Sequence, residues 1–364
     1  MKLLVHGDAW PGSGAWCYAE TLREMGHEVS QVGDYAGLEH YRTSVKSRLY
    51  RKLFQRLRES DRRQHIQLLK REVERFSPQI IIVLKGLFLS NEDVHHLRQN
   101  NRWVCNINHD DFFSFNPNNW SRLQRAAIPA YDWIFTTREV NVKEVQPLNP
   151  NVSFLQFAYY PKIHRIVPIS DSEIELLNAD VIFVGTFAVE RARLLERLVS
   201  EVPARYAIYG SQWEKLSFRS PLKKWVHPKE LYLDNLAKAL GGAKVALGFL
   251  RKENRDDYTQ RTFEIPACGG CFLAERTKRH SDFYREGEEA EFFDAESSKE
   301  LCAKVRGLLE DSIRRERIRR NGRAALLRQK HTYRDRMEQV FAAFEGLATG
   351  AKYSVVEGLA MGRD

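Results

Sequence analysis

The sequence predicts an α/β protein made of two doubly wound parallel-sheet domains in series. First, its 364 residues exceed what one ordinary core accommodates. Second, short apolar runs rich in β-branched residues alternate with helical stretches over residues 2–157 and again over 180–329. Third, residues 159–178 between them, with Pro161 and Pro168, carry little strand signal. We therefore expect a domain boundary within this intervening segment.

The first half supplies the strands of one sheet. Residues Pro78–Leu84 form a continuous apolar run, which is typical of a parallel strand buried on both faces. A helix predicted at Ala15–Met25 ends at Gly26, the usual helix stop. The predicted strands of this half are Lys2–His6, Glu28–Val32, Pro78–Leu84, Trp103–Ile107, Trp133–Thr136 and Ser153–Phe157. Repeated strand–helix units of this kind predict a parallel sheet.

The second half repeats the alternation. Its predicted strands are Asp180–Val184, Arg205–Tyr209, Lys244–Phe249 and a strand beginning at Cys271. Its predicted helices are Val189–Ser200, Lys229–Leu240, Thr262–Cys268, Ser297–Leu309 and Ser312–Gln329. We accordingly expect an N-terminal domain at 1–165, a C-terminal domain at 166–330, a helix at 331–348 that returns to the N-terminal domain, and a tail at 349–364.

Composition indicates a folded protein of a reducing compartment. Hydrophobic residues make up 43% of the chain and aromatic residues 11%, which excludes a disordered protein. No apolar run approaches the roughly 18 residues of a membrane-spanning helix, and the start MKLLVHGDAW predicts a first strand rather than a signal peptide. Five cysteines, an odd number, fit a reducing compartment. We therefore expect a cytoplasmic protein, peripheral at the inner membrane face if its basic segment binds lipid.

Basic charge is concentrated in one segment. The net charge is +9, and residues 42–75 hold twelve Lys or Arg against four Asp or Glu, a local charge of +8. Apolar residues recur every fourth position from Tyr41 to Leu57, which predicts a helix. This helix either packs on the first domain with its cations in water or binds an anionic membrane surface or acidic acceptor. Nucleic acid is the least favoured partner, because no nucleic-acid-binding motif accompanies the charge.

The stretch from Asn254 to Glu275, NRDDYTQRTFEIPACGGCFLAE, carries residues suited to a nucleotide. The predicted helix offers free N–H groups to an anion, and Arg261 adds a fork of donors for a phosphate. Glu264, an acceptor when ionised, suits paired sugar hydroxyls. The alternative is a capped helix in which Glu264 forms a salt bridge with Arg261. The one CxxC motif, Cys268–Cys271, lacks the second pair of a structural zinc site, so we expect two small buried residues and no metal.

Further candidates follow other predicted strands, at the edge where such sheets bind ligands. The loop after the first strand has neither a GxGxxG nor a Walker spacing, so Gly12 and Gly14 either approach a substrate or only make the turn. His109 and Asp110 suit a contact to a substrate hydroxyl or a proton transfer. A turn histidine paired with an aspartate, or an under-ligated metal site, is the alternative. The second domain adds Gly185, Arg191, Tyr209 and Gly210, with Arg191 placed to reach a pyrophosphate.

The sequence resembles GT-B-fold glycosyltransferases, which have two Rossmann-like domains facing across a cleft. More narrowly, its second half resembles the spore-maturation CgeB-type glycosyltransferase family. The resemblance spans about residues 1–345 and is more specific in the second half. It rests on the segments Asp180–Thr186, Asp256–Gly270, Gly287–Glu289 and His331–Arg334.

The resemblance implies that the second domain binds a nucleotide-diphosphate-sugar donor and the first domain an acceptor. Glu264 takes the place of a glutamate that binds the nucleotide ribose, and Asp256 that of its sugar-contacting partner, one methylene shorter. His109 takes the place of a histidine that contacts the donor sugar. Arg191 lies near the residue that holds the diphosphate, and Arg261 substitutes for an arginine that is Thr186 here. The expected donor site is completed by Gly185, Tyr209, Gly210, Thr262 and Phe263, and the acceptor-side loop by Gly12, Gly14 and Asp110.

The resemblance further implies glycosyl transfer without a metal or other cofactor, with retention favoured by analogy. The expected acceptor is a glycan, a lipid-linked glycan or a protein, in cell-envelope or glycoconjugate biosynthesis. One alternative is a non-catalytic nucleotide-sugar-binding or scaffold protein, which Asp256 and Thr186 favour. Another is a nucleotide-sugar epimerase, which needs acid–base residues on both sides of one sugar.

Overall fold

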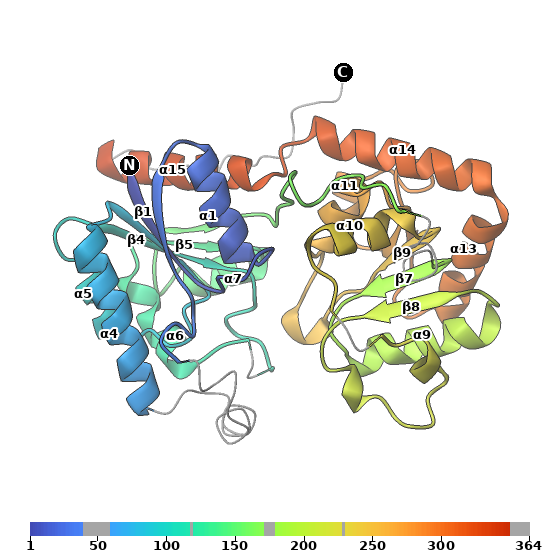
Figure 1. Cartoon of the computed structure of the whole chain (residues 1–364), viewed down its shortest axis with the longest axis horizontal. Helices are drawn as coiled ribbons and strands as arrows, with labels where there is room; N and C mark the ends of the chain where they lie inside the picture. The colour runs from blue at the N-terminus through green and yellow to red at the C-terminus, as the bar shows by residue number, and fades with distance from the viewer. Residues whose placement is uncertain (39–58, 117–118, 171–178, 228–229, 350–364) are drawn as a thin grey trace. The chain divides into compact units, whose positions relative to one another are not determined.

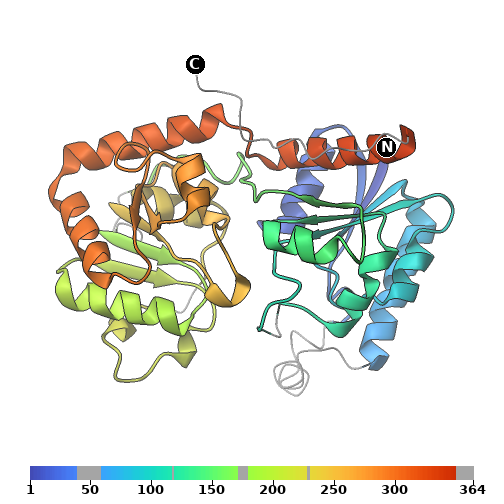
Figure 2. The ribbon, with the colours of Figure 1, turned by 180° about the vertical axis from the view of Figure 1, so that it is seen from behind.

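The structure is a computed structural model, and it describes residues 1–38, 59–116, 119–170, 179–227 and 230–349. The chain divides into two compact units. The N-terminal unit comprises Met1–Phe157, Lys252–Arg255 and the chain from Tyr333 on, and the C-terminal unit comprises Ala158–Arg251 and Asp256–Thr332. Each unit has a parallel sheet with helices on both faces (Figures 1 and 2). The predicted fold class, two doubly wound α/β units, is confirmed.

The N-terminal sheet has six parallel strands in the order β2-β1-β3-β4-β5-β6. They are β1 (Lys2–His6), β2 (Glu28–Val32), β3 (Ile80–Leu84), β4 (Trp103–Asn108), β5 (Trp133–Thr136) and β6 (Val152–Phe154). Every residue of β3 is buried, as its continuous apolar run predicts. The strand order reverses between β1 and β3, and open α/β sheets bind ligands outside the carboxyl ends of strands at such a switch point.

Helices cover both faces of this sheet. On one face α4 (Glu59–Phe76) and α5 (Asn91–Leu97) pack through Ile66, Leu69 and Val94. On the other face α15 (Tyr333–Thr349) packs beside α1 (Gly14–Glu24). The buried Arg336 fastens α15 by donating to the carbonyls of Gln156 and Phe157. Shorter helices are α6 (Arg122–Ala127) and α7 (Glu139–Val145).

The basic segment is only partly described. Helix α4 accounts for its end from Glu59 on, whereas the helix predicted from Tyr41 to Leu57 lies outside the described residues. Within the described ranges, no helix is long and apolar enough to cross a bilayer.

The C-terminal sheet has five parallel strands in the order β11-β10-β9-β7-β8. They are β7 (Val181–Val184), β8 (Tyr206–Tyr209), β9 (Val245–Gly248), β10 (Phe272–Glu275) and β11 (Glu291–Phe293). Strand β11 was not predicted, because its three residues are too few to show a pattern. The other four lie within two residues of their predicted bounds.

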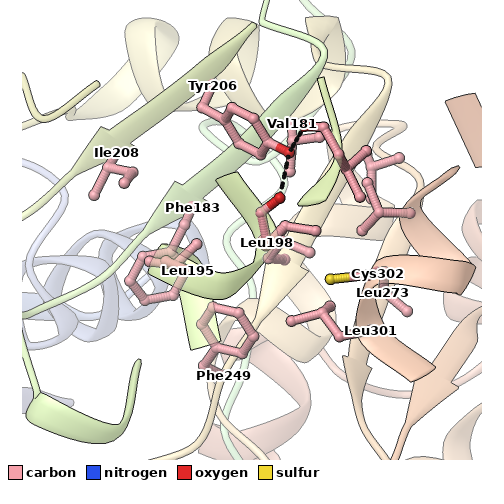
Figure 3. Close-up of a cluster of buried hydrophobic side chains, with 14 of the residues drawn as sticks. Val181, Phe183, Leu195, Leu198, Tyr206, Ile208, Phe249, Leu273, Leu301 and Cys302 are labelled. Carbon is pink, nitrogen blue, oxygen red and sulfur yellow. Dashed lines mark hydrogen bonds between the residues drawn. The ribbon is translucent and has the colours of Figure 1, made fainter. Parts of the chain in front are cut away.

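One face of this sheet packs against α9 (Val189–Glu201) and α13 (Ser298–Glu310). Figure 3 shows this core, where the hydroxyl of buried Tyr206 donates to the carbonyl of Leu198. The other face carries α10 (Leu233–Gly242), α11 (Arg261–Ala267) and α14 (Ser312–Arg328), and α12 (Lys278–Phe283) follows β10.

Helix α10 runs two residues beyond its predicted end. A Cβ on Gly241 would lie 2.3 Å from the carbonyl oxygen of Cys268, so glycine here lets α10 pack closely against the end of α11. Cys268 and Cys271 are buried with free thiols, as expected of small residues beside a glycine turn.

Candidate functional site

Glu264 lies in the first turn of α11 and is the centre of a buried polar network in the C-terminal unit. The residue is 2% exposed. One carboxylate oxygen accepts from Arg261 Nη1, and the other lies 3.1 Å from His164 Nε2. Arg261 also donates through Nε to the carbonyl of Val184 at the end of β7. The network therefore fixes the start of α11 against the carboxyl end of β7.

The hydrogen bonds fix the proton on His164. Its Nδ1 accepts from the backbone N–H of Tyr160 at 2.9 Å, so in the neutral ring Nε2 carries the hydrogen and donates to Glu264. Burial and the charge of Arg261 lower the pKa of His164 to about 3, which keeps the ring neutral. Burial lowers the pKa of Arg261 to about 10, so its guanidinium stays charged at neutral pH beside the Glu264 carboxyl.

The predicted salt bridge between Arg261 and Glu264 is thus present, and it leaves capacity for a ligand. Each carboxylate oxygen has two lone-pair sites, and only one on each is used by these two partners. A quarter of the Arg261 side chain, 26%, is exposed. The pair can therefore offer acceptors to hydroxyl groups and guanidinium N–H groups to an anion.

The residues next to Glu264 are placed differently from the sequence prediction. Phe263 is fully buried and its ring stacks on His331 with centroids 4.3 Å apart, so it is a core residue and not a ligand contact. Thr262 is 1% exposed, and its hydroxyl lies 3.0 Å from His280 Nε2. Both side chains hold α11 in the unit. Six of the seven residues of α11 are buried, so the helix is enclosed on nearly all sides. A segment this short has no periodic pattern from which that burial could be predicted.

Asp256 closes a loop. Its carboxylate accepts from the backbone N–H of Arg251 at 3.3 Å, and its own N–H donates to the Arg251 carbonyl. The Asp256 side chain is 2% exposed. These bonds tie the two ends of the segment 252–255 together, and the Asp256 side chain is about as buried as that of Glu264.

Gly185 and Gly210 make a turn in which two backbone segments approach each other. A Cβ on Gly210, whose φ is +135°, would lie 2.2 Å from the carbonyl oxygen of Gly185. The Gly185 N–H donates to the carbonyl of Tyr209, whose ring stacks on His227 at 4.4 Å. The space that the glycines free is therefore taken by the chain itself, and not left for a ligand as predicted.

The side chain of Arg191 is likewise bound to the backbone of the protein. It is 6% exposed and donates to the carbonyls of Thr186, Phe249 and Leu250 at 2.8–3.2 Å. The prediction that it reaches a pyrophosphate is not supported by this geometry, since three of its donors are bound to backbone. Its position joins the loops that follow β7 and β9.

The predicted residues of the N-terminal unit gather at the carboxyl ends of its strands. His109 is half-buried, its Nε2 lies 3.4 Å from the Tyr18 hydroxyl, and burial together with Arg138 lowers its pKa to about 4. Gly14, the first residue of α1, lies beside this ring, since a Cβ there would be 3.6 Å from it. Asp110 is paired with Lys85 at 2.7 Å. A neutral imidazole at this edge suits a hydroxyl contact.

Gly12 takes φ +91°, a backbone conformation that favours glycine, so it makes the turn before α1. The alternative stated for Gly12, that it only makes the turn, therefore accounts for its backbone geometry. Among the described residues, no group of three His, Cys, Asp or Glu side chains is arranged to hold a metal ion.

Sequence reasoning missed two networks whose partners are far apart in the chain. His164 stands a hundred residues before Glu264, in a segment without strand or helix signal. Arg255 donates to both oxygens of buried Asp111, at 2.5 and 2.8 Å, and to Glu144. Only the fold brings such partners together, and no local spacing predicts them.

Comparisons with known proteins agree with this architecture. Residues 190–342 match the protein family described as "Glycosyl transferase-like". A sucrose-phosphate synthase from Thermosynechococcus elongatus has a similar structure, with a TM-score of 0.68 and 13% identity over 96% of this chain and 99% of that one. Anabaena HepE in complex with UDP and glucose has a TM-score of 0.64 and 12% identity over 95% and 100% of the two chains.

A candidate UDP-N-acetylglucosamine 2-epimerase from Listeria monocytogenes is similar too, with a TM-score of 0.55 and 10% identity over 97% and 98% of the two chains. The comparison with curated proteins finds no match. At these identities the structural likenesses establish the GT-B fold, and the family match bears on activity. The chain has the GT-B fold, and the match of residues 190–342 to the glycosyl transferase-like family supports a glycosyltransferase.

Proposed function

We propose that this glycosyltransferase moves a sugar from a nucleotide-diphosphate-sugar donor, and that the donor binds at the Arg261–Glu264 pair. The observation that carries the proposal is a buried ion pair at the carboxyl end of β7, inside the stretch that matches the glycosyl transferase-like family. The structurally similar HepE has been captured with UDP and with UDP-glucose, which supports a nucleotide sugar as the donor.

In this proposal Glu264 accepts hydrogen bonds from the ribose hydroxyls, and His164 holds its carboxylate in place. Charge-assisted bonds of this type are the strong ones, worth about 1.5–3 kcal/mol each. The exposed part of Arg261 meets negative charge that develops on the leaving diphosphate, which is preorganised electrostatic stabilisation.

The finer assignments are proposals of the same kind. We propose membership of the CgeB-type family, transfer with retention and no metal requirement, and an acceptor that is a glycan, a lipid-linked glycan or a protein of the cell envelope. The acceptor is assigned to the N-terminal unit, where His109 and Asp110 lie. The basic segment 42–75 is proposed to dock on anionic lipid at the inner membrane face.

The test is a calorimetric and thermal-shift panel of nucleoside diphosphates and their sugars. A ligand present at about 100 times its Kd stabilises the protein by about 2.7 kcal/mol, which is readily measured. One nucleotide should bind, and Glu264→Gln should weaken it about tenfold or more, since a charge-assisted bond becomes a neutral one. Glu310→Gln, at an exposed position of the same unit, is the matched control. Binding that is equal in all three proteins contradicts the assignment of the site.

Product analysis separates the alternatives. A transferase releases or transfers the sugar and leaves the nucleoside diphosphate, and the anomeric configuration of the product reports retention. An epimerase inverts one ring carbon and leaves the glycosidic bond intact. A scaffold protein binds the nucleotide sugar and turns over none of it. Activity that persists in a chelator supports the proposed metal independence, and activity lost in a chelator and restored by a divalent cation contradicts it.

A further inference from the structure

A second group of ionisable side chains gathers at the switch point of the N-terminal sheet, and nothing in the donor site uses it. His6 ends β1, Asp34 follows β2 and His65 lies on α4. The Nε2 atoms of the two histidines are 3.0 Å apart, and His6 Nδ1 lies 3.7 Å from an Asp34 carboxyl oxygen. We name this group the His6–Asp34 relay, with His65 as its third member.

Hydrogen bonds fix the protons along the relay. His65 Nδ1 lies 3.3 Å from the carbonyl of Ala36, which only accepts, so this nitrogen carries a hydrogen. In the neutral ring His65 Nε2 is then a lone pair, and His6 Nε2 must donate to it. His6 Nδ1 is therefore a lone pair as well, and it faces Asp34. Two lone pairs repel each other, so the favoured state has a proton on the Asp34 carboxyl.

The charges around the relay favour the same state. Burial and the nearby Asp8 raise the pKa of Asp34 to about 7, against the opposing effect of Lys85. Burial and His65 lower the pKa of His6 to about 3, and burial lowers that of His65 despite its bond to Ala36. The imidazoles are thus neutral.

Burial decides which member a ligand can touch. His6 and His65 are both fully buried, and His6 Nδ1 has no hydrogen-bond partner in the structure. The Asp34 side chain is 21% exposed. A buried acceptor without a hydrogen-bond partner costs free energy, and such a group in a native structure calls for an explanation.

We propose that Asp34 binds a hydroxyl group of the acceptor, and that His6 and His65 position its carboxyl for a neutral polyol such as a sugar. The protonated carboxyl turns its O–H toward His6 Nδ1, 3.7 Å away, and its other oxygen to the ligand as an acceptor. Asp34 is the binding residue, and the histidines act through it. The proposal rests on the proposed function, because it assigns the acceptor of the same transferase.

The charge of the surroundings selects against anionic acceptors. Asp8 adds negative charge beside Asp34, and the amino group of Lys85 is bound by Asp110 at 2.7 Å. A phosphate at this point would meet acceptors and negative charge, whereas a hydroxyl group meets the acceptor it needs. The site therefore favours a glycan hydroxyl and disfavours a phosphorylated group.

The experiment uses the full chain with saturating UDP and ligand-observed NMR. The probes are methyl α-D-glucopyranoside, a neutral polyol, and inorganic phosphate, an anion. Asp34→Ala should lose the glycoside signal. Asp34→Asn should keep it, because the amide N–H replaces the carboxyl O–H toward His6 and the amide oxygen still accepts. Glu92→Gln, at an exposed position of the same unit, is the control.

A pH profile tests the positioning histidine. In the wild type, glycoside binding should change between about pH 6 and about pH 8, as Asp34 loses the proton that orients it, while Asp34→Asn stays constant. His6→Gln should move the midpoint of this change to lower pH, because an amide N–H stabilises the ionised carboxyl. A merely structural role would lower affinity at every pH and leave the midpoint unchanged.

Three results would overturn the proposal: an equal glycoside signal in Asp34→Ala and wild type, loss of binding in Asp34→Asn, or tighter binding of phosphate than of glycoside. The donor site is judged separately by UDP affinity, which the Asp34 variants should leave unchanged. If UDP does not bind but the glycoside signal depends on Asp34, the donor proposal fails and the Asp34 site stands.

Discussion

The ion pair between Arg255 and Asp111 gives the sharpest test of the forces that hold the N-terminal unit together. Asp111 is fully buried, and burial alone would raise its pKa, but bonds from Arg255 and Asn141 hold that pKa below its ordinary value. The substitution Arg255→Ala removes two charge-assisted bonds to Asp111 and two to Glu144, and it leaves the Asp111 carboxylate with its neutral donors. Breaking a buried pair from one side costs about 3–5 kcal/mol.

The exposure of Arg255 reduces this figure. A third of its side chain, 34%, is exposed, so water already solvates part of the guanidinium. We therefore expect a smaller loss of stability than this range, about 2–3 kcal/mol. The assay is hydrogen exchange of the N-terminal sheet, read by mass spectrometry, because a two-unit protein need not unfold in one step.

Arg255→Gly is the matched control. Arg255 has a φ of +48°, in the left-handed region that costs a non-glycine residue about 1–2 kcal/mol. Glycine removes the ion pair but relieves this strain, so it should destabilise the unit by about 1 kcal/mol less than alanine. Equal protection in Arg255→Ala and wild type would refute the reasoning, and so would an alanine variant that is more stable than the glycine variant.

Three other predictions address separate features. Because the folded-state pKa of Asp34 is raised from 3.8 to about 7, its contribution to stability is full below about pH 4 and lost as pH rises through 7; Asp34→Asn should match wild type in acid and exceed it by up to about 4 kcal/mol near pH 8, in denaturant melts at the two pH values. Gly210→Ala should lower the Tm by several degrees, since its Cβ meets the Gly185 carbonyl at 2.2 Å, whereas Gly287→Ala, where nothing lies within 4 Å but φ is also positive, should cost only the backbone strain. The fraction of protein that floats with anionic liposomes should fall when four basic residues outside the described part of the chain are neutralised, namely Arg48, Arg51, Lys52 and Arg56. An unchanged flotation curve would refute membrane docking.

The fold was largely predictable because its signals are local. The apolar run that became β3 and the glycine turn after Cys268 need only a few consecutive residues to be recognised. Glu264 could be singled out for the same reason, since it stands near the predicted helix start, three residues after Arg261.

Side-chain directions and distant partners were not predictable. Phe263 adjoins Glu264 in sequence, yet one enters the core and the other meets His164. Arg191 looked free to reach a phosphate, but the carbonyls that engage it come from a loop about sixty residues later. Such bonds depend on the tertiary path of the chain, which no local pattern of residues contains.

The interleaving of the two units has a consequence for how the protein is made. Helix α15, which packs beside α1, is synthesised after the whole of the C-terminal unit. The segment 252–255, which also belongs to the N-terminal unit, is synthesised after about half of the C-terminal unit. As the chain leaves the ribosome, the first six strands emerge with the surface of α1 still uncovered and Asp111 still without Arg255. N-terminal domains generally fold first because they are synthesised first. Here the N-terminal unit can complete its fold only after the C-terminal unit has been synthesised, and the apolar surface of α1 needs protection until α15 has left the ribosome.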